Sequence, residues 1–490
     1  MRTRVGAVLL ALLAALLVAS CGGGGGGGGG NKVSGGGGSV PAGADYVPST
    51  AKGFFFVSTD TGGGQWKNAD DLLKNFSGRK QLIAMIEQSL AKQKLDYETD
   101  IEPALGPETD AGILSFQGST GNAVIAAQPQ DESKFKALLN KVASDEPSTA
   151  ITRKVGDWTL ASDTQAALDA AVSAHNGTSL ADNATFKEAM GDLPGEALAK
   201  LWLDGAALTG LAKPKTGGTG TLPGFGKLLS LAAAVQAQSD GLSIRSAVKT
   251  SQALPLQNYS AQLVDQVPSG ALAYLSVSGL DRTIEALATI PAVKTQLASI
   301  EQQLGVSLQQ LASLFAGEGA LYVRQGVPLP EVTLVLKQAD EAAARTLADK
   351  IFARVAPALG GQIVATTVSG VPVKQVRGQQ FSLYYAVFDG ELVVTDSTTG
   401  ISGLKDTGSK LSDDSLFKDA KSAAGMPDSN AGFFYVNLKD TIPIIENLVT
   451  SSGRNIPPAV QQNLEPLRTA LFYATIDGAK AIGSGFIGIQ

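Results

Sequence analysis

The chain repeats itself, and this repetition limits the possible folds more than any other feature of the sequence. The motif Val47-Pro48-Ser49, with the apolar run behind it, returns 220 residues later as Val267-Pro268-Ser269. LADNATFKEA matches LSDDSLFKDA 231 residues on, and Asp240-Gly241 matches Asp477-Gly478 at an offset of 237. Matches that keep their order while the offset grows slowly indicate a duplicated unit with small insertions.

The duplication predicts two tandem repeat domains. Copy one covers residues 47–250, copy two covers residues 267–490, and residues 251–266 would connect them. Each copy has about 200 residues, which is long enough to bury a hydrophobic core of its own.

Helical and extended patterns follow one another irregularly inside each copy. An apolar strand opens the copy and a pair of helices follows it. The predicted pairs are Trp66–Phe76 with Arg79–Lys94, and Arg282–Ile290 with Ala292–Leu304. Further on, Asp131 and Asp340 can each start a helix, because an aspartate side chain accepts from free N–H groups there. Strands mixed with helix pairs, without strict alternation, favour an α+β fold with a largely antiparallel sheet and helices packed on it.

Three predicted strands are apolar on both of their alternating faces: FFFVS from Phe54, FSLYYAVF from Phe381 and GFFYVNL from Gly432. Such strands are typical of a sheet that is covered on both sides, so we expect them to lie between two layers. The alternative is an exposed aromatic wall or a lined cleft that binds something apolar.

The opening of copy one also resembles a known family. The stretch VPSTAKGFFFVSTDTGGGQWKNADDLLKNFSG, which contains Trp66, and DIEPALGPETDAGIL from Asp100 are similar to an uncharacterised bacterial envelope lipoprotein family known only as a domain of unknown function. The resemblance spans most of residues 47–450. It implies a place in the cell envelope. The family has no established reaction, so the resemblance implies no catalytic residues.

The first residues have the layout of a secretory signal. Two arginines precede an uncharged apolar run, Val5–Ser20, that is shorter than the ~20 residues of a membrane-spanning helix. The tetrad Val18-Ala19-Ser20-Cys21 resembles the bacterial lipobox, which implies cleavage before Cys21 and lipidation of its thiol. Residues 1–20 are therefore predicted to be a lipoprotein signal peptide. The alternative is an uncleaved signal anchor with an incidental cysteine.

Residues 21–46 are predicted to be a flexible tether. The runs Gly22–Gly30 and Gly35–Gly38 cannot bury a core, so they are expected to stay a coil. Twenty such residues have a root-mean-square reach of about 25 Å. The predicted location is extracytoplasmic, with the body held to a bacterial membrane through lipid on Cys21.

Composition narrows the possible chemistry and partners. Cys21 is the only cysteine, so a lipidated chain keeps no thiol for a disulfide, a metal or a nucleophile. The formal net charge is −6, which argues against nucleic acid and against anionic lipid as partners.

A set of motifs invites comparison with penicillin-binding serine hydrolases, which use S-x-x-K, S-D-N and K-T-G in that order. This chain offers Ser133–Lys136, then Ala181-Asp182-Asn183, then Lys215-Thr216-Gly217. The middle motif has Ala181 where a hydroxyl is needed, the last lies in a glycine- and proline-rich segment, and S-x-x-K recurs elsewhere in the chain. Ser133 is therefore expected to lie on a helix surface.

Two further candidates have a simpler structural interpretation. Gly483–Gly488 fits the dinucleotide fingerprint, but no helix can follow it, so it reads as a glycine-spaced terminal strand. His175, the only histidine, is expected to contact the last carbonyls of a helix. We predict no catalytic residue, no metal ligand and no cofactor.

The sequence therefore predicts a non-catalytic, membrane-tethered envelope lipoprotein that serves as an interaction or scaffold module. The alternatives are a binding or carrier module for an apolar ligand and, more remotely, a penicillin-interacting serine hydrolase. The expected partners are the membrane, through Cys21, and an envelope protein or an apolar ligand.

Overall fold

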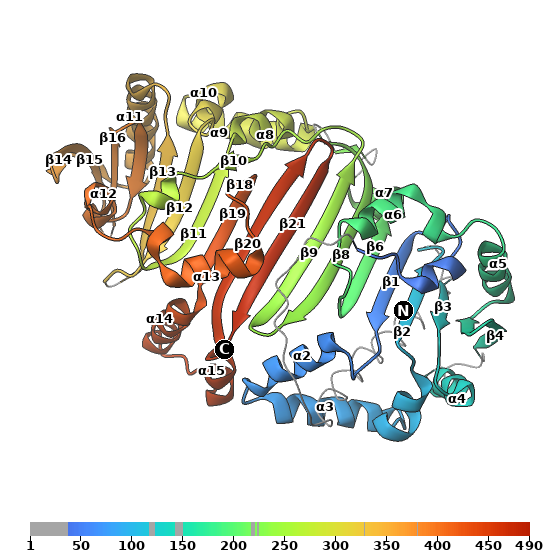
Figure 1. Ribbon diagram of the computed structural model, residues 1–490. Coiled ribbons are helices and arrows are strands. Elements are labelled where there is room, and N and C mark those ends of the chain that lie inside the picture. The colour runs from blue at the N-terminus through green and yellow to red at the C-terminus, as the bar shows by residue number, and fades with distance from the viewer. Residues whose placement is uncertain are drawn as a thin grey trace.

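The computed structural model describes residues 38–116, 123–142, 150–216, 221–222, 225–327, 329–379 and 381–490. Cys21, residues 1–20 and most of the predicted tether lie outside these residues. We call residues 38–250 the first half and residues 251–490 the second half. The predicted α+β fold class is confirmed, because helices pack on one large antiparallel sheet (Figure 1).

Within the described residues the sheet has 19 strands. In the first half they pair in the order β4 (Ile151–Val155), β5 (Trp158–Ser162), β3 (Ala123–Ala127), β2 (Glu108–Ile113), β1 (Gly53–Ser58), β6 (Ala199–Asp204), β8 (Gly226–Gln238) and β9 (Gly241–Thr250). The short strand β7 (Thr221–Leu222) pairs with the start of β8.

The second half continues the sheet from β9. Its strands pair in the order β21 (Lys480–Ile489), β20 (Leu467–Asp477), β19 (Gly432–Asn437), β11 (Ala271–Ser278), β12 (Glu318–Arg324), β13 (Glu331–Lys337), β17 (Glu391–Thr395), β16 (Ser382–Phe388), β15 (Val371–Arg377) and β14 (Gln362–Val368). The strands β10 (Tyr259–Ser260) and β18 (Ser429–Asn430) form a separate pair.

Strand pairing follows the same plan in the two halves. β1 lies between β2 and β6, and β11 lies between β12 and β19. The halves meet where β9 pairs with β21, and Ser246 there faces Gly483. These two residues are 237 apart, which is also the offset between the two Asp-Gly pairs. A duplicated unit related by an approximate twofold axis would give this arrangement. The division into two domains stays a prediction, because one sheet runs through both.

Helices lie on both faces of the sheet. The front face, turned toward the viewer in Figure 1, packs against η1 (Ala42–Tyr46), α5 (Gln165–His175), η4 (Leu180–Asp182), α6 (Ala184–Gly191), η5 (Leu263–Asp265), α12 (Thr398–Lys405), η6 (Leu411–Asp413) and α13 (Ser415–Ala424).

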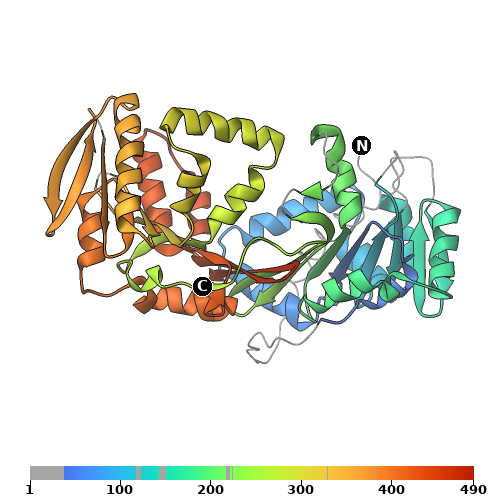
Figure 2. The same ribbon diagram turned by 90° about the horizontal axis from the view of Figure 1, so that it is seen from above.

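The back face packs against α2 (Gly64–Lys74), α3 (Arg79–Lys92), η2 (Tyr97–Ile101), η3 (Glu102–Ala104) and α4 (Glu132–Val142) in the first half, and against α10 (Leu308–Ser313) and α11 (Glu341–Ala358) in the second. Helices α8 (Leu280–Leu287) and α9 (Pro291–Leu304) pack against α10 and α11 (Figure 2). The remaining helices are α7 (Gly205–Thr216), α14 (Leu438–Ser451) and α15 (Pro458–Leu464).

The helix starts predicted from aspartates are confirmed. The Asp131 carboxylate accepts from the backbone N–H of Ser133 at 2.8 Å, and the Asp340 carboxylate accepts from that of Ala343 at 3.0 Å. These bonds satisfy N–H groups that have no partner within the first turn of a helix.

The first half has two cores, one on each side of the sheet. Val124 packs into the front core and its neighbour Ile125 into the back core, because successive strand residues point to opposite faces. Phe54 and Val57 of β1 divide in the same way. The prediction that FFFVS lies between two layers is therefore confirmed. Among the described residues, no helix is long and apolar enough to span a membrane.

Candidate apolar binding face

A row of apolar side chains crosses the back face of the sheet where the two halves meet. The row has one residue from each of seven neighbouring strands, and each residue pairs with the next one. In the order of the strands they are Leu321, Leu275, Phe434, Phe472, Gly485, Ile244 and Val235. We call these seven residues the apolar strip. Phe434 is 42% exposed, Leu321 40%, and Phe472 and Ile244 are each 37% exposed.

The front side of the same strands is closed. Phe433, Tyr435 and Leu471, which alternate with the exposed phenylalanines, are at most 3% exposed and lie in the front core. The prediction that GFFYVNL lies between two layers is therefore wrong for its back face. Helix α14 contacts β11, β19 and β20, yet Phe434 stays 42% exposed, so the back face of β19 is only partly covered.

The chemistry of the strip is uniform. None of its residues has a charge or a hydrogen-bonding side chain. Its strands, from β12 to β8, each pair with a neighbour on both sides, so their backbone N–H and C=O groups are already bonded within the sheet. The strip can therefore contact a partner only through apolar surface.

Glycine makes the strip continuous at its centre. A Cβ atom built on Gly485 would lie 2.1 Å from Cδ1 of Phe472, so the phenylalanine ring lies directly over the glycine. The ring thereby covers Gly485 of β21, whose partner on β9 is Ile244. The terminal segment Gly483–Gly488 lies within β21, as predicted, and its glycine spacing has this packing reason.

Helix α2 shows how the back face is covered in the first half. The Trp66 indole is buried and donates to the carbonyl of Ser58 at 2.8 Å. Gln65 accepts from the N–H of Ala237, and Asn68 donates to its carbonyl, which fastens α2 to β8. Helix α8, which follows β11 as α2 follows β1, buries none of its residues.

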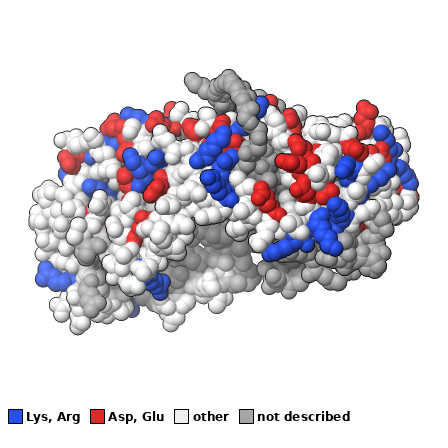
Figure 3. Space-filling model, turned by 90° about the horizontal axis from the view of Figure 1, so that it is seen from below, with Lys and Arg blue, Asp and Glu red and all other residues white. Residues whose placement is uncertain are grey.

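Charge is distributed unevenly over the molecule. Seen from below, Lys, Arg, Asp and Glu gather along the side of the front-face helices (Figure 3).

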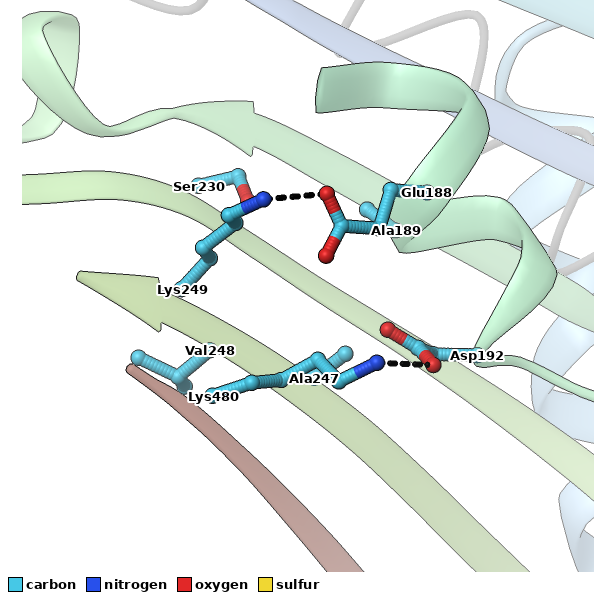
Figure 4. Close-up of a pocket in the computed structure, with 8 residues that line it drawn as sticks. All are labelled: Glu188, Ala189, Asp192, Ser230, Ala247, Val248, Lys249 and Lys480. Atoms are coloured by element: carbon cyan, nitrogen blue, oxygen red, sulfur yellow. Dashed lines mark hydrogen bonds and ion pairs between the residues drawn. The ribbon is translucent and has the colours of Figure 1, made fainter. Parts of the chain in front are cut away.

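The front face has a small cavity at the seam between the halves (Figure 4). Lys249 of β9 pairs with Glu188 of α6, and Lys480 of β21 pairs with Asp192 at 2.9 Å, which raises the pKa of Lys480. The cavity volume is about 10 Å³, room for about one water molecule. Of the two ion pairs, only that of Lys480 with Asp192 joins the halves, and the cavity is too small for an organic ligand.

Buried carboxylates hold the first turn of each half. Glu108 and Asp110 accept from the N–H groups of Ala42 and Gly43, at 3.1 and 2.9 Å. Burial raises the pKa of Asp110 well above its usual range, and the charge of Glu108 adds to the shift. Burial lowers the pKa of Lys200, which donates to the carbonyl of Gly195.

In the second half, a single carboxylate makes the equivalent bonds to the backbone. Glu318 accepts from the N–H groups of Gln262 and Leu263, each at 2.9 Å. The offset of 220 that separates the two Val-Pro-Ser motifs also separates Ala42 from Gln262. Nearby, burial raises the pKa of Glu391 to about 7. Because Glu108, Asp110 and Glu318 bond backbone groups of their own chain, we assign these three carboxylates to the fold.

The family of the chain follows from its match to a family model. The model described as "Protein of unknown function (DUF3352)" matches residues 4–472. The chain belongs to DUF3352. No curated protein matches it.

Solved structures give only distant likenesses to this DUF3352 member. "Structure of crystal form IV of TP0453" has 13% sequence identity and a TM-score of 0.24, and covers 46% of this chain and 93% of the other. "Structure of crystal form III of TP0453" has 13% identity and a TM-score of 0.23, and covers 47% and 95%.

The hydrolase-like motifs of this DUF3352 member lie on opposite sides of the sheet. Ser133 is exposed at the start of α4, whose Phe135 packs into the back core. Ala181 and Asp182 belong to η4, on the front face, and Asn183 caps α6 there by accepting from the N–H of Phe186. Lys215 and Thr216 are the last residues of α7 and do not lie in the loop expected from the glycines and prolines around them, and Gly217 lies outside the described residues. Ser133 and Asn183 therefore do not converge.

His175 lies at the end of α5, as predicted, and its ring stacks on Tyr46 with centroids 4.4 Å apart. Within the described part of the DUF3352 chain, no group of three His, Cys, Asp or Glu residues could hold a metal ion. Cys21, the predicted lipidation site, lies outside the described residues.

Proposed function

We propose that this chain is a non-catalytic lipoprotein, held outside the cytoplasm to a bacterial membrane through lipid on Cys21, and that its body binds an envelope component through the apolar strip. The apolar strip carries the proposal. Four large apolar side chains, Leu321, Phe434, Phe472 and Ile244, are more than a third exposed on central strands, where a sheet is normally covered.

The lipobox-like tetrad and the glycine-rich stretch support the tethered location. Lipid on Cys21 would hold the body within about 25 Å of a membrane, by the reach of a flexible chain. Intact mass spectrometry of membrane-extracted protein tests this part. We expect a chain that begins at Cys21 and carries acyl groups, with both features lost in Cys21→Ser. A free thiol on an unprocessed N-terminus would contradict it.

The binding role is tested with anilinonaphthalene sulfonate, a dye that fluoresces on apolar surfaces. The full chain carrying Cys21→Ser removes the anchor lipid from the assay. We expect Phe434→Gln and Phe472→Gln to lower dye binding about fivefold or more, since each removes apolar surface from the strip.

The matched control is Ile363→Gln, because Ile363 is 39% exposed on β14, away from the strip. It should leave dye binding unchanged. Circular dichroism checks that each variant is folded. Folded strip variants that bind dye as well as the parent would overturn the binding role.

The non-catalytic part has its own test. The opposite placement of Ser133 and Asn183 predicts that a fluorescent penicillin does not label the chain covalently. Labelling that disappears in Ser133→Ala would instead show a serine hydrolase.

A further inference from the structure

We infer that the occupant of the apolar strip is the hydrocarbon chain of a membrane lipid, lying across the strands from β12 toward β8. This inference rests on the proposed function, because it names the chemistry of what the strip binds. Three observations support it. The backbone groups beneath the strip are already hydrogen-bonded, the strip is long and apolar, and the predicted tether keeps it close to a membrane.

Hydrogen bonding favours hydrocarbon over a polypeptide strand. The strands beneath Leu275, Phe434 and Phe472 use their backbone groups on both neighbours, and these side chains offer no donor or acceptor. A peptide laid on this face would lose its bonds to water and find no replacement, at a cost of 1–3 kcal/mol or more for each buried group. An acyl chain has no such groups to satisfy.

The neighbouring rows on the back face continue the same chemistry. One row contains Ala273, Val436, Ala470, Ile487 and Leu242. On the other side, Gly432, Ala474 and Gly483 lead to Ser246, which has the one hydroxyl of this row. The strip therefore lies within a wider surface of aliphatic and small residues. These rows carry no charged side chain, so nothing in them would bind a lipid headgroup or another charged ligand.

The length of the strip fits an extended chain. It crosses seven strands, from Leu321 to Val235, and neighbouring strands are about 4.8 Å apart, so it is about 29 Å long. The hydrocarbon core of a bilayer is about 30 Å thick, so one lipid chain extends about 15 Å. A full acyl chain can therefore lie extended along about half of the strip.

The Phe472 ring over Gly485 makes this path continuous. Without it, the strip would be interrupted at the glycine, which lies between Phe472 and Ile244. A chain that lies on this ring contacts residues from both halves, so both halves contribute to one site.

The test measures how binding depends on chain length. Saturated fatty acids of 8 to 18 carbons compete with a fluorescent long-chain acyl probe for the full Cys21→Ser chain. Burying a whole methylene is worth about fourfold in affinity, and a chain lying on one surface buries about half of each, so we expect about twofold tighter binding per carbon.

Two variants that lie within one chain length of each other on the strip place the ligand. Leu321→Gln and Phe472→Gln, three strand spacings or about 14 Å apart, should each weaken binding of the 18-carbon acid about tenfold. Each should weaken the 8-carbon acid less, because a short chain can shift away from either position. Ile363→Gln is again the control and should change neither acid. Native mass spectrometry should show phospholipid retained by the parent and lost in Phe434→Gln.

The outcomes separate the two proposals. If the strip variants lose dye binding but no fatty acid competes, the strip binds a different partner; the inference fails and the proposed function stands. If the parent sediments as a dimer that Phe434→Gln dissociates, and no acid binds, a second copy covers the strip and the inference fails. If the native Cys21 chain excludes the probe while Cys21→Ser binds it, the occupant is the chain's own lipid, not a membrane lipid. Failure of dye binding itself would overturn both.

Discussion

Helices α2 and α8 occupy comparable positions in the two halves, yet only α2 closes the sheet beneath it. Helix α2 follows β1, buries Trp66 and Leu72, and is bonded to β8 through Gln65 and Asn68. Helix α8 follows β11 and buries none of its residues. The comparison shows that a face of the sheet is buried or exposed according to whether a helix packs against it. The strand itself can carry the same apolar pattern in both cases.

The alternation of β1 and β19 supports this conclusion. Both strands have aromatic residues on both faces. In β1 the front residue Phe54 and the back residue Val57 are both buried, whereas in β19 Phe433 is buried and Phe434 is exposed. The difference therefore comes from the covering layer.

The largest expected effect comes from breaking the covered half. Trp66→Ala removes a buried indole and its bond to Ser58, and should lower the free energy of unfolding by about 3–5 kcal/mol. Leu287→Ala on α8, where the side chain is 37% exposed, should cost about 1 kcal/mol or less. Urea denaturation measures both. Equal losses would show that α8 supports its half as α2 does.

A smaller effect is expected at the centre of the strip. Gly485→Ala places a methyl group where the Phe472 ring lies, which should cost about 1–2 kcal/mol and reduce dye binding as the ring moves. Gly210→Ala in α7 is the control, since a Cβ there meets nothing within 4 Å. Stability and dye binding unchanged in Gly485→Ala would show that the ring does not depend on the glycine.

Glu391 should give the second half a distinct pH dependence. Its pKa in the folded chain is about 7, above the usual 4.5, so the folded state holds this proton more tightly than the unfolded state. Its stabilising contribution is complete below pH 4.5 and is lost as the pH rises to about 7. Glu391→Gln should remove this loss, which is at most about 3 kcal/mol.

The control for this pH effect is Glu132→Gln, because ion pairing with Lys136 lowers the pKa of Glu132. The stability from that pair is present above the ordinary pKa and is lost as the pH falls, so the substitution should leave the decline between pH 5 and 7 in place. Denaturation curves at several pH values decide the comparison. Parallel curves for the parent and Glu391→Gln would contradict the prediction.

The smallest effect is expected at the seam on the front face. Lys480→Met breaks the ion pair with partly buried Asp192 and should cost about 0.5–1 kcal/mol. Lys421→Met breaks a pair with Asp428, whose side chain is 89% exposed, and should change stability by less. Added salt should reduce the difference. A larger loss of stability from Lys421→Met than from Lys480→Met would contradict this prediction.

Local features of the fold were predictable from the sequence. The helix pair predicted at Trp66–Phe76 and Arg79–Lys94 corresponds to Gly64–Lys74 and Arg79–Lys92. The starts at Asp131 and Asp340 are where the caps lie. These features depend on neighbouring residues, which a sequence pattern records directly.

Long-range features were not predictable. Nothing near Ser246 or Gly483 indicates that their strands pair, since the two residues are far apart in the chain and lie in ordinary hairpins. The exposure of Phe434 depends on a helix that follows another strand. One signal was available: Trp66 has no counterpart in LDRTIEAL, the sequence of α8.

The pairing of β9 with β21 also bears on how the molecule comes apart. Nine residue pairs join these strands, from Lys480 opposite Lys249 to Gly488 opposite Gly241. Heating should therefore melt both halves in a single cooperative transition. A protease that nicks the segment at residues 251–258 should leave two fragments that remain associated until they denature.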